Sequence, residues 1–182
     1  MDNDLGLWAV PLAMLGGAIR VSTPFLFVSL GEVLTERSGR INLGLEGTLG
    51  FGAMAGYATA VLTGSAWADV GLAALNVNVL FLAGAGLAWM LRATRLGLIL
   101  RVVGDSTDAA RALGLRPNLI RALATAAGGA LAGVGGAYLS LYYPGSWNEG
   151  LSSGQGLMAV ALVIFARWNP LACFGAAILF GG

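Results

Sequence analysis

The chain has no lysine, no histidine and only one cysteine in 182 residues. A Walker A phosphate loop and a Schiff base both need lysine, and a serine or cysteine nucleophile activated by an imidazole needs histidine. This chain alone therefore cannot form such sites. The single thiol of Cys173 excludes an internal disulfide and a cysteine zinc site, so we expect a small buried side chain there. We expect no catalytic residue, no metal and no cofactor, and thus no enzyme.

Charged residues are also scarce. They make up 10% of the chain, against about 25% in soluble domains, and apolar residues make up 57%. The mean hydropathy is +0.79. Three stretches without any charge, 47–68, 70–91 and 122–148, each exceed the roughly 20 residues that a helix needs to cross a bilayer core. The shorter runs 150–166 and 168–182 add one further crossing and the beginning of another.

These runs predict an all-α fold. We expect a polytopic membrane helical bundle in the lipid bilayer, with about five full spans plus a partial sixth, forming a single domain over 1–182. The first span falls within residues 5–34, which include Arg20 and Pro24, so we expect an interfacial beginning and a bent helix. Residues 1–5 carry two aspartates and lack the basic region of a secretory signal, so we expect them to remain in the mature protein.

The arginines predict the orientation. Cytoplasmic loops of membrane proteins retain arginine and lysine, and an N-terminus outside the cell places nine of the ten arginines in cytoplasmic loops. Six of them fall between residues 92 and 121, which we therefore expect to form the main cytoplasmic loop.

Glycine is abundant inside the apolar stretches, for example at Gly52, Gly56, Gly128 and Gly133. Small residues at four-residue spacing let helix backbones approach closely in lipid. This pattern indicates either tight packing within the bundle or an interface with a second membrane subunit.

Residues 39–47 combine charge, an asparagine and three glycines directly before an apolar span. We predict a broken helix there, because irregular backbone at membrane depth is tolerated where it lines a cavity. Asn42 and Glu46 would then face a polar solute. The alternative is an interfacial loop in which Glu46 pairs with Arg37 or Arg40.

A second broken helix is predicted over 148–154, which repeats the N-x-G-L pattern of 42–45 and also leads into an apolar span. The two segments enter from opposite faces of the membrane. An inverted-topology repeat has this arrangement and binds its solute where the two broken elements meet.

Four segments then carry a resemblance to a known family. The sequence GEVLTERSG, continuing to residue 47, resembles the N-terminal signature of ABC-importer permeases in the branched-chain amino acid, ribose and nucleoside group, closest to nucleoside (simple sugar) permeases. Residues 94–105 resemble the family's TxxGLxLRAVGEN loop, 109–115 its AAxAxGI motif, and 147–170 its W-x-EGxTxGxGxxAxAxVIFxxWxP segment.

This resemblance implies a transmembrane permease subunit of an ATP-driven importer, in the bacterial inner membrane. Its expected partners are cytoplasmic ABC ATPase subunits, a second permease subunit and an extracytoplasmic solute-binding protein, with no nucleic acid. The expected activity is import of a nucleoside or related sugar-type solute by alternating access. The alternatives are a non-transporting packing subunit or inactive permease fragment, and a membrane-embedded enzyme using the close carboxylates Glu32 and Glu36, which we place at an interface.

The resemblance also assigns residues. The family's coupling segment maps onto 104–117, where Ser106 or Thr107 can cap a short helix over 105–113 and Asp108 lies near its N-terminus. The residues expected to couple to the ATPase are Arg101, Gly104, Asp105, Ala109, Ala110 and Gly114. Those expected along the solute path are Asn42, Glu46, Trp147, Asn148 and Glu149, which would supply hydrogen bonds to ribose hydroxyls and a stacking surface.

The chain departs from the family pattern in two places. Between residues 66 and 92 it has one crossing where the family usually has three, and it ends at residue 182 where the family continues. We therefore expect a form shortened internally and at its C-terminus. Losing two spans preserves the orientation of everything after them.

Overall fold

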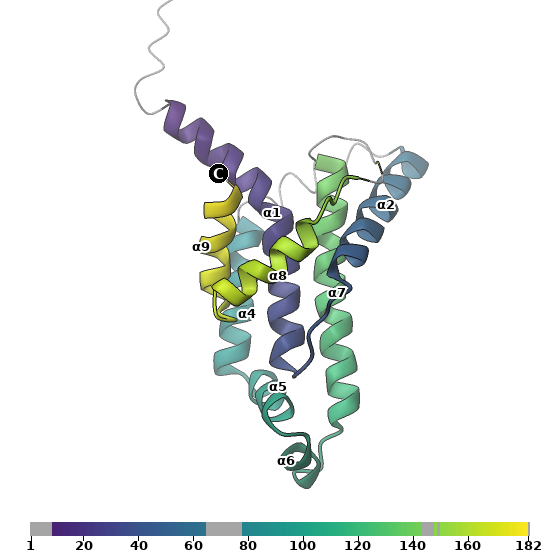
Figure 1. Cartoon of the computed structure of the whole chain (residues 1–182), viewed down its shortest axis with the longest axis vertical. Coiled ribbons are helices and arrows are strands. Elements are labelled where there is room, and N and C mark those ends of the chain that lie inside the picture. The colour runs from purple at the N-terminus through teal and green to yellow at the C-terminus, as the bar shows by residue number, and fades with distance from the viewer. Residues whose placement is uncertain (1–8, 65–77, 143–147, 149, 182) are drawn as a thin grey trace, which may run out of the picture.

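The computed structural model describes residues 9–64, 78–142, 148 and 150–181. These residues form helices and no strand, so the all-α prediction is confirmed for this part of the chain (Figure 1). The helices are α1 (Ala9–Arg37), α2 (Leu45–Thr63), α4 (Asn78–Ala93), α5 (Arg95–Asp105), α6 (Thr107–Ala112), α7 (Pro117–Tyr142), α8 (Gln155–Phe165) and α9 (Pro170–Gly181).

The central element is α1, which packs against α7, α9, α8 and α4. Its N-terminal half is largely exposed, whereas every residue from Ser22 to Thr35 is buried. The helix changes direction along its length (Figure 1). Pro24 lies inside it and has no N–H for the carbonyl of Arg20, which explains a bend at this level. The bent first helix was predicted.

Glycines let α7 approach both α1 and α2 closely. A methyl group added to Gly31 of α1 would collide with the backbone of Gly128 in α7. The same substitution at Gly52 of α2 would collide with the backbone of Gly133, also in α7. The glycine pattern therefore serves packing within this chain, the first of the two interpretations that it allowed.

Two helices, α1 and α7, are each long and apolar enough to cross a membrane by length and composition. The 26 residues of α7 extend over about 39 Å at the usual helical rise, more than the bilayer core requires. The 11 residues of α8 extend over only about 16 Å, so this helix reaches roughly half-way.

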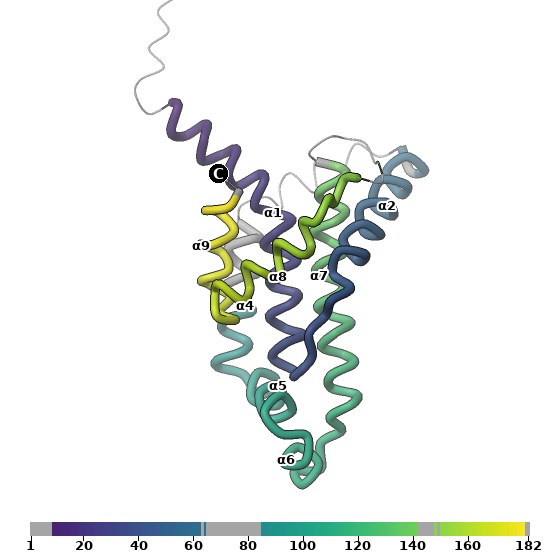
Figure 2. Tube along the Cα trace, viewed as in Figure 1, coloured from purple at the N-terminus to yellow at the C-terminus, as the bar shows by residue number. Residues whose placement is uncertain are grey.

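The chain leaves the helix at both predicted places. Between α1 and α2 it runs as irregular backbone over 38–44, and Figure 2 shows this connection rising along the bundle before α2 begins. Residues 45–47 already belong to α2. Before α8, the described residues from Gly150 to Gly154 form turns.

The two short helices α5 and α6 lie together at one end of the bundle, below the C-terminal end of α1 and the start of α7 (Figure 1). Six of the ten arginines fall between residues 92 and 121, which run from the end of α4 through α5 and α6 to the start of α7. This end therefore carries the positive charge that the sequence predicts for the cytoplasmic side.

Candidate functional site

The connection after α1 begins with a tight turn around Gly39. The amide nitrogens of Ser38 and Gly39 donate to the carbonyls of Thr35 and Glu36, at 3.0 and 2.8 Å. Gly39 has φ +85°, in the left-handed region that glycine adopts without steric cost. This turn stops α1 and redirects the chain toward α2.

Glu32 holds the next part of the connection. Its side chain is fully buried, and its Oε1 accepts a 2.8 Å hydrogen bond from the backbone N–H of Asn42. The side-chain oxygen of Asn42 in turn accepts from the N–H of Gly44 at 3.1 Å. Glu32, which was expected at an interface, is covered by the connection after α1. Asn42 is half-buried, and its side chain bonds within its own turn.

The two broken segments meet at Glu46, in the first turn of α2. Its two carboxylate oxygens accept hydrogen bonds from the N–H groups of Gly154, at 2.9 Å, and Gly156, at 2.7 Å. Those amides open α8, so one carboxylate lies at the N-termini of two helices, where the helix dipoles favour negative charge. Glu46 therefore bonds to backbone amides rather than to Arg37 or Arg40.

The other residues predicted along the solute path are placed less centrally. Asn148 is exposed, and its carbonyl accepts from the N–H of Leu151 at 3.2 Å. Trp147 and Glu149 lie outside the described residues. The structure thus brings Glu46 to the second broken segment, whereas Asn42 and Asn148 each bond locally.

Gln155, at the start of α8, was missed by the sequence analysis. It lines a cavity of about 160 Å³ together with Tyr138 and Leu139 of α7 and with Arg20 and Pro24 of α1. Its side-chain oxygen is buried without a hydrogen-bond partner within the described residues. The sequence feature that could have indicated it is a polar amide between two glycines at the start of an apolar run. A buried polar atom of this kind normally has a partner, so a bound group can supply one here.

The opposite end of the molecule carries the short helix predicted in the coupling segment. Ser106 caps α6, because its hydroxyl oxygen accepts from the N–H of Ala109 at 3.2 Å. Asp108 lies in the first turn and pairs with Arg111 at 3.0 Å. Gly114 ends the helix with φ +77°, and Leu115 donates back to the carbonyl of Ala110 at 3.0 Å.

The residues predicted to couple divide into two groups. Asp105, Ala109 and Gly114 are exposed at this end. Ala110 is fully buried, and Gly104 packs so closely on α1 that an added methyl group would lie 2.6 Å from the carbonyl oxygen of Arg37. Arg101 reaches inward and donates to the carbonyl of Leu91 at the end of α4. The residues predicted to couple thus comprise exposed residues at this end and the residues that hold them on the bundle. The exposed leucines Leu98 and Leu113 belong to the same end.

Arg121, near the start of α7, connects this end to the first broken segment. Its Nε donates to the carbonyl of Ser38 at 2.9 Å, and its NH2 group donates to the carbonyl of Val103 at 3.0 Å. The sequence analysis treated Arg121 only as the boundary of the basic loop. The sequence feature that could have indicated its role is a charged residue in the first turns of a long apolar helix, because the donors of such a residue must find partners.

These features describe a helical bundle with one basic end, two helices long and apolar enough to cross a membrane, and two interrupted segments that meet at Glu46. The family model described as "Branched-chain amino acid transport system / permease component" matches residues 72–182. The match covers more than half of the chain, so the chain belongs to this permease family. It includes α4 to α9, and with them the capped helix α6 and the start of α8.

Three relatives agree with the family. The putative glucose ABC transporter permease protein TsgC13 of Haloferax volcanii is 27% identical over 92% of this chain and 74% of its own length. The nucleoside ABC transporter permease protein NupC of Lactococcus lactis is 28% identical over 88% and 77%. The guanosine ABC transporter permease protein NupQ of Bacillus subtilis is 31% identical over 57% and 33%. No solved structure matches.

The alignment with TsgC13 extends over 245 positions, more than the 182 residues of the chain. That relative therefore has residues opposite gaps in this chain. The predicted internal shortening agrees with such gaps.

Proposed function

We propose that this permease subunit moves a nucleoside or a related sugar-type solute across the inner membrane by alternating access, driven by ATP hydrolysis in partner ATPase subunits. The observation that carries the proposal is the permease-family match, because it contains the capped helix α6 and the start of α8. The names of two relatives specify a nucleoside and guanosine, and the name of the third specifies glucose. Nucleosides, including guanosine, contain a pentose ring, and the hydroxyls of this ring need hydrogen-bonding groups in a binding site.

The proposed topology is a single transmembrane domain over 1–182 with about five full spans and a partial sixth. The full spans would be built on α1, α2, α4, α7 and the segment 150–166. In that segment α8 covers roughly half of the bilayer core and follows the turns at 150–154. The partial span would be α9. The loop 92–121 would lie in the cytoplasm. The connections at the α5 and α6 end support this orientation, because nine of the ten arginines fall in loops assigned to that side.

The proposed solute path runs past the junction of the two broken segments. There Glu46 binds the start of α8. The neighbouring Gln155 lines a cavity, and its side-chain oxygen is buried without a partner among the described residues. Discontinuous helices that meet inside a bundle are the usual solute-binding element of transporters. Asn42, Trp147, Asn148 and Glu149 complete the proposed path, as the residues that flank the same two segments.

The proposed coupling site is the α5 and α6 end. Asp105, Ala109 and Gly114 would contact the ATPase, while Gly104 and Ala110 hold the segment on the bundle. Arg101 would transmit the movement to α4 through its bond to Leu91. An extracytoplasmic solute-binding protein and a second permease subunit are the remaining proposed partners.

The test is ATP-dependent uptake of labelled guanosine, with glucose and a branched-chain amino acid as competing solutes. The variant Ala109→Trp enlarges an exposed side chain on α6, and Ala13→Trp makes the same change at an exposed position on α1. Both variants should reach the membrane, and only Ala109→Trp should abolish uptake and lose the co-purifying ATPase. Uptake that survives in Ala109→Trp and in a scrambled 104–115 segment would instead favour a packing subunit without transport of its own.

A further inference from the structure

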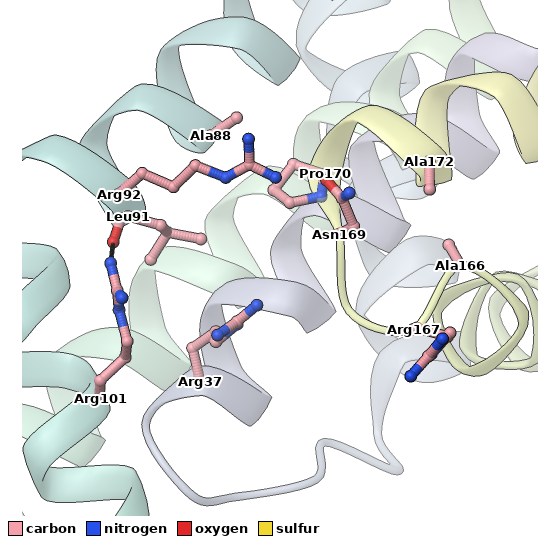
Figure 3. Close-up of a pocket in the computed structure, with 10 residues that line it drawn as sticks. All are labelled: Arg37, Ala88, Leu91, Arg92, Arg101, Ala166, Arg167, Asn169, Pro170 and Ala172. Atoms are coloured by element: carbon pink, nitrogen blue, oxygen red, sulfur yellow. Dashed lines mark hydrogen bonds between the residues drawn. The ribbon is translucent and has the colours of Figure 1, made fainter.

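Four arginines surround one cavity at the basic end of the bundle. The cavity has a volume of about 510 Å³, within the range of ligand pockets. Figure 3 shows the four arginines that line it: Arg37 at the end of α1, Arg92 in α4, Arg101 in α5, and Arg167 in the turn before α9.

No carboxylate lines this cavity among the described residues. Glu36, next to Arg37 in α1, lines a neighbouring cavity instead. Within the same described part of the chain, the ion pair that forms joins Arg111 to Asp108 in α6. Four like charges around one hollow repel one another, so an anion in the cavity lowers the free energy of the arrangement.

Two of the guanidiniums are fixed by the backbone. Arg37 donates to the carbonyl of Trp168 at 3.2 Å, and Arg101 donates to the carbonyl of Leu91. Yet the Nε of Arg37 is buried without an acceptor. These bonds hold the positive charges in place and leave a donor unsatisfied, as in a site prepared for an oxygen-bearing anion.

The other two guanidiniums are available. Arg92 and Arg167 are exposed, and their side chains make no hydrogen bond or ion pair with the part of the chain that the structure describes. Arg167 and Trp168 both have left-handed φ angles, +52° and +56°, which turn the chain sharply between α8 and α9. This turn brings Arg167 into the cavity wall at the N-terminus of α9, where the helix dipole adds positive potential.

We propose that this cavity binds a phosphate group, and that its source is an anionic phospholipid of the cytoplasmic leaflet. Arginine forks match phosphate oxygens in bidentate geometry, and basic pockets between membrane helices on the cytoplasmic side bind anionic head groups. The phosphate site follows from the cavity alone. The assignment of the phosphate to a lipid rests on the topology given under the proposed function. If the site proves absent, the proposed importer function is unaffected.

The test uses the full chain in mild detergent with its co-purifying subunits. Native mass spectrometry follows the binding of phosphatidylglycerol, phosphatidylcholine and inorganic phosphate in separate titrations. The double variant Arg92→Gln/Arg167→Gln removes the two arginines that have no protein partner. The control Arg95→Gln/Arg116→Gln removes two exposed arginines of the same basic end, neither of which lines the cavity.

Phosphatidylglycerol should bind in preference to phosphatidylcholine, and the double variant should bind it about 30-fold more weakly, since each basic side chain near an anionic head group contributes about a factor of five. The control should change affinity by less than about threefold. Inorganic phosphate that competes with the lipid at similar concentration supports the phosphate site and assigns it a free anion. Equal losses of phosphatidylglycerol affinity in the two double variants would overturn the proposal. Unchanged lipid binding in Arg92→Gln/Arg167→Gln would also overturn it, including when that variant loses the ATPase subunits.

Discussion

The Nε of Arg121 in α7 donates a 2.9 Å hydrogen bond to the carbonyl oxygen of Ser38, 83 residues earlier in the chain. The same guanidinium bonds to Val103 in α5. One side chain therefore joins the first broken segment, the helix before the coupling segment, and the long helix α7. A displacement of α5 and α6 must move this bonded group, which gives a physical link between the basic end and the interior junction.

Arg121→Gln should destabilise the protein by about 2 to 4 kcal/mol. Hydrogen bonds from a charged donor contribute about 1.5 to 3 kcal/mol each, and the shorter, uncharged side chain weakens or loses both of them. Thermal unfolding in detergent measures the effect. Arg95→Gln is the matched control, since Arg95 is exposed and its side chain makes no hydrogen bond or ion pair with the described residues. Equal melting temperatures for the two variants would contradict the assigned role.

Glu46→Gln should weaken the junction between α2 and α8 by about 1 to 3 kcal/mol. The amide keeps one acceptor but places an NH2 group against the N–H of Gly154 or Gly156, and it removes the negative charge from two helix N-termini. Asp108→Asn is the control, because its ion pair is exposed and contributes about 0 to 1 kcal/mol. Hydrogen exchange at the first amides of α8 should rise only in Glu46→Gln.

Gly156→Ala should cost about 1 to 3 kcal/mol through overpacking. The added methyl group would lie 2.7 Å from the backbone N and Cα of Glu46, and backbone atoms cannot rotate away. Gly175→Ala in α9 meets nothing within 4 Å and should be neutral or slightly stabilising. Equal melting temperatures for the two variants would contradict the close contact of Gly156 in α8 with the backbone of Glu46 in α2.

Ser106→Ala should destabilise α6 by about 1 kcal/mol, because it removes the N-cap acceptor for Ala109. The loss is local, so the amides of α6 should exchange faster while the melting temperature of the bundle barely changes. Ser106→Asp restores an acceptor and should restore slow exchange. If the capped helix docks on the ATPase, solute-stimulated ATP hydrolysis should fall in Ser106→Ala and return in Ser106→Asp.

Local physics made several of these features predictable. The interruption after Arg37 follows from glycine and asparagine at the edge of an apolar run, and the short helix α6 follows from Ser106 and Asp108 in its first turns. The close helix contacts follow from glycine spacing. Each depends on neighbours in sequence, so the pattern alone was sufficient.

Partner choice was not predictable in the same way. Glu46 had arginines nearby in sequence, and pairing with them was a reasonable alternative. The structure instead places it against amides that follow it by more than 100 residues. Likewise, nothing in the sequence shows that the connection after α1 folds back over Glu32.

The sequence by itself determined that this is a helical permease-family protein with a basic end, since apolar length, arginine position and motif order are properties of the chain. Only the tertiary structure decided which groups meet. It joined the two broken segments through Glu46, tied Ser38 to Arg121, and gathered four arginines around one cavity. Such contacts depend on the relative positions of packed helices, and close backbone approach at glycine sets these positions.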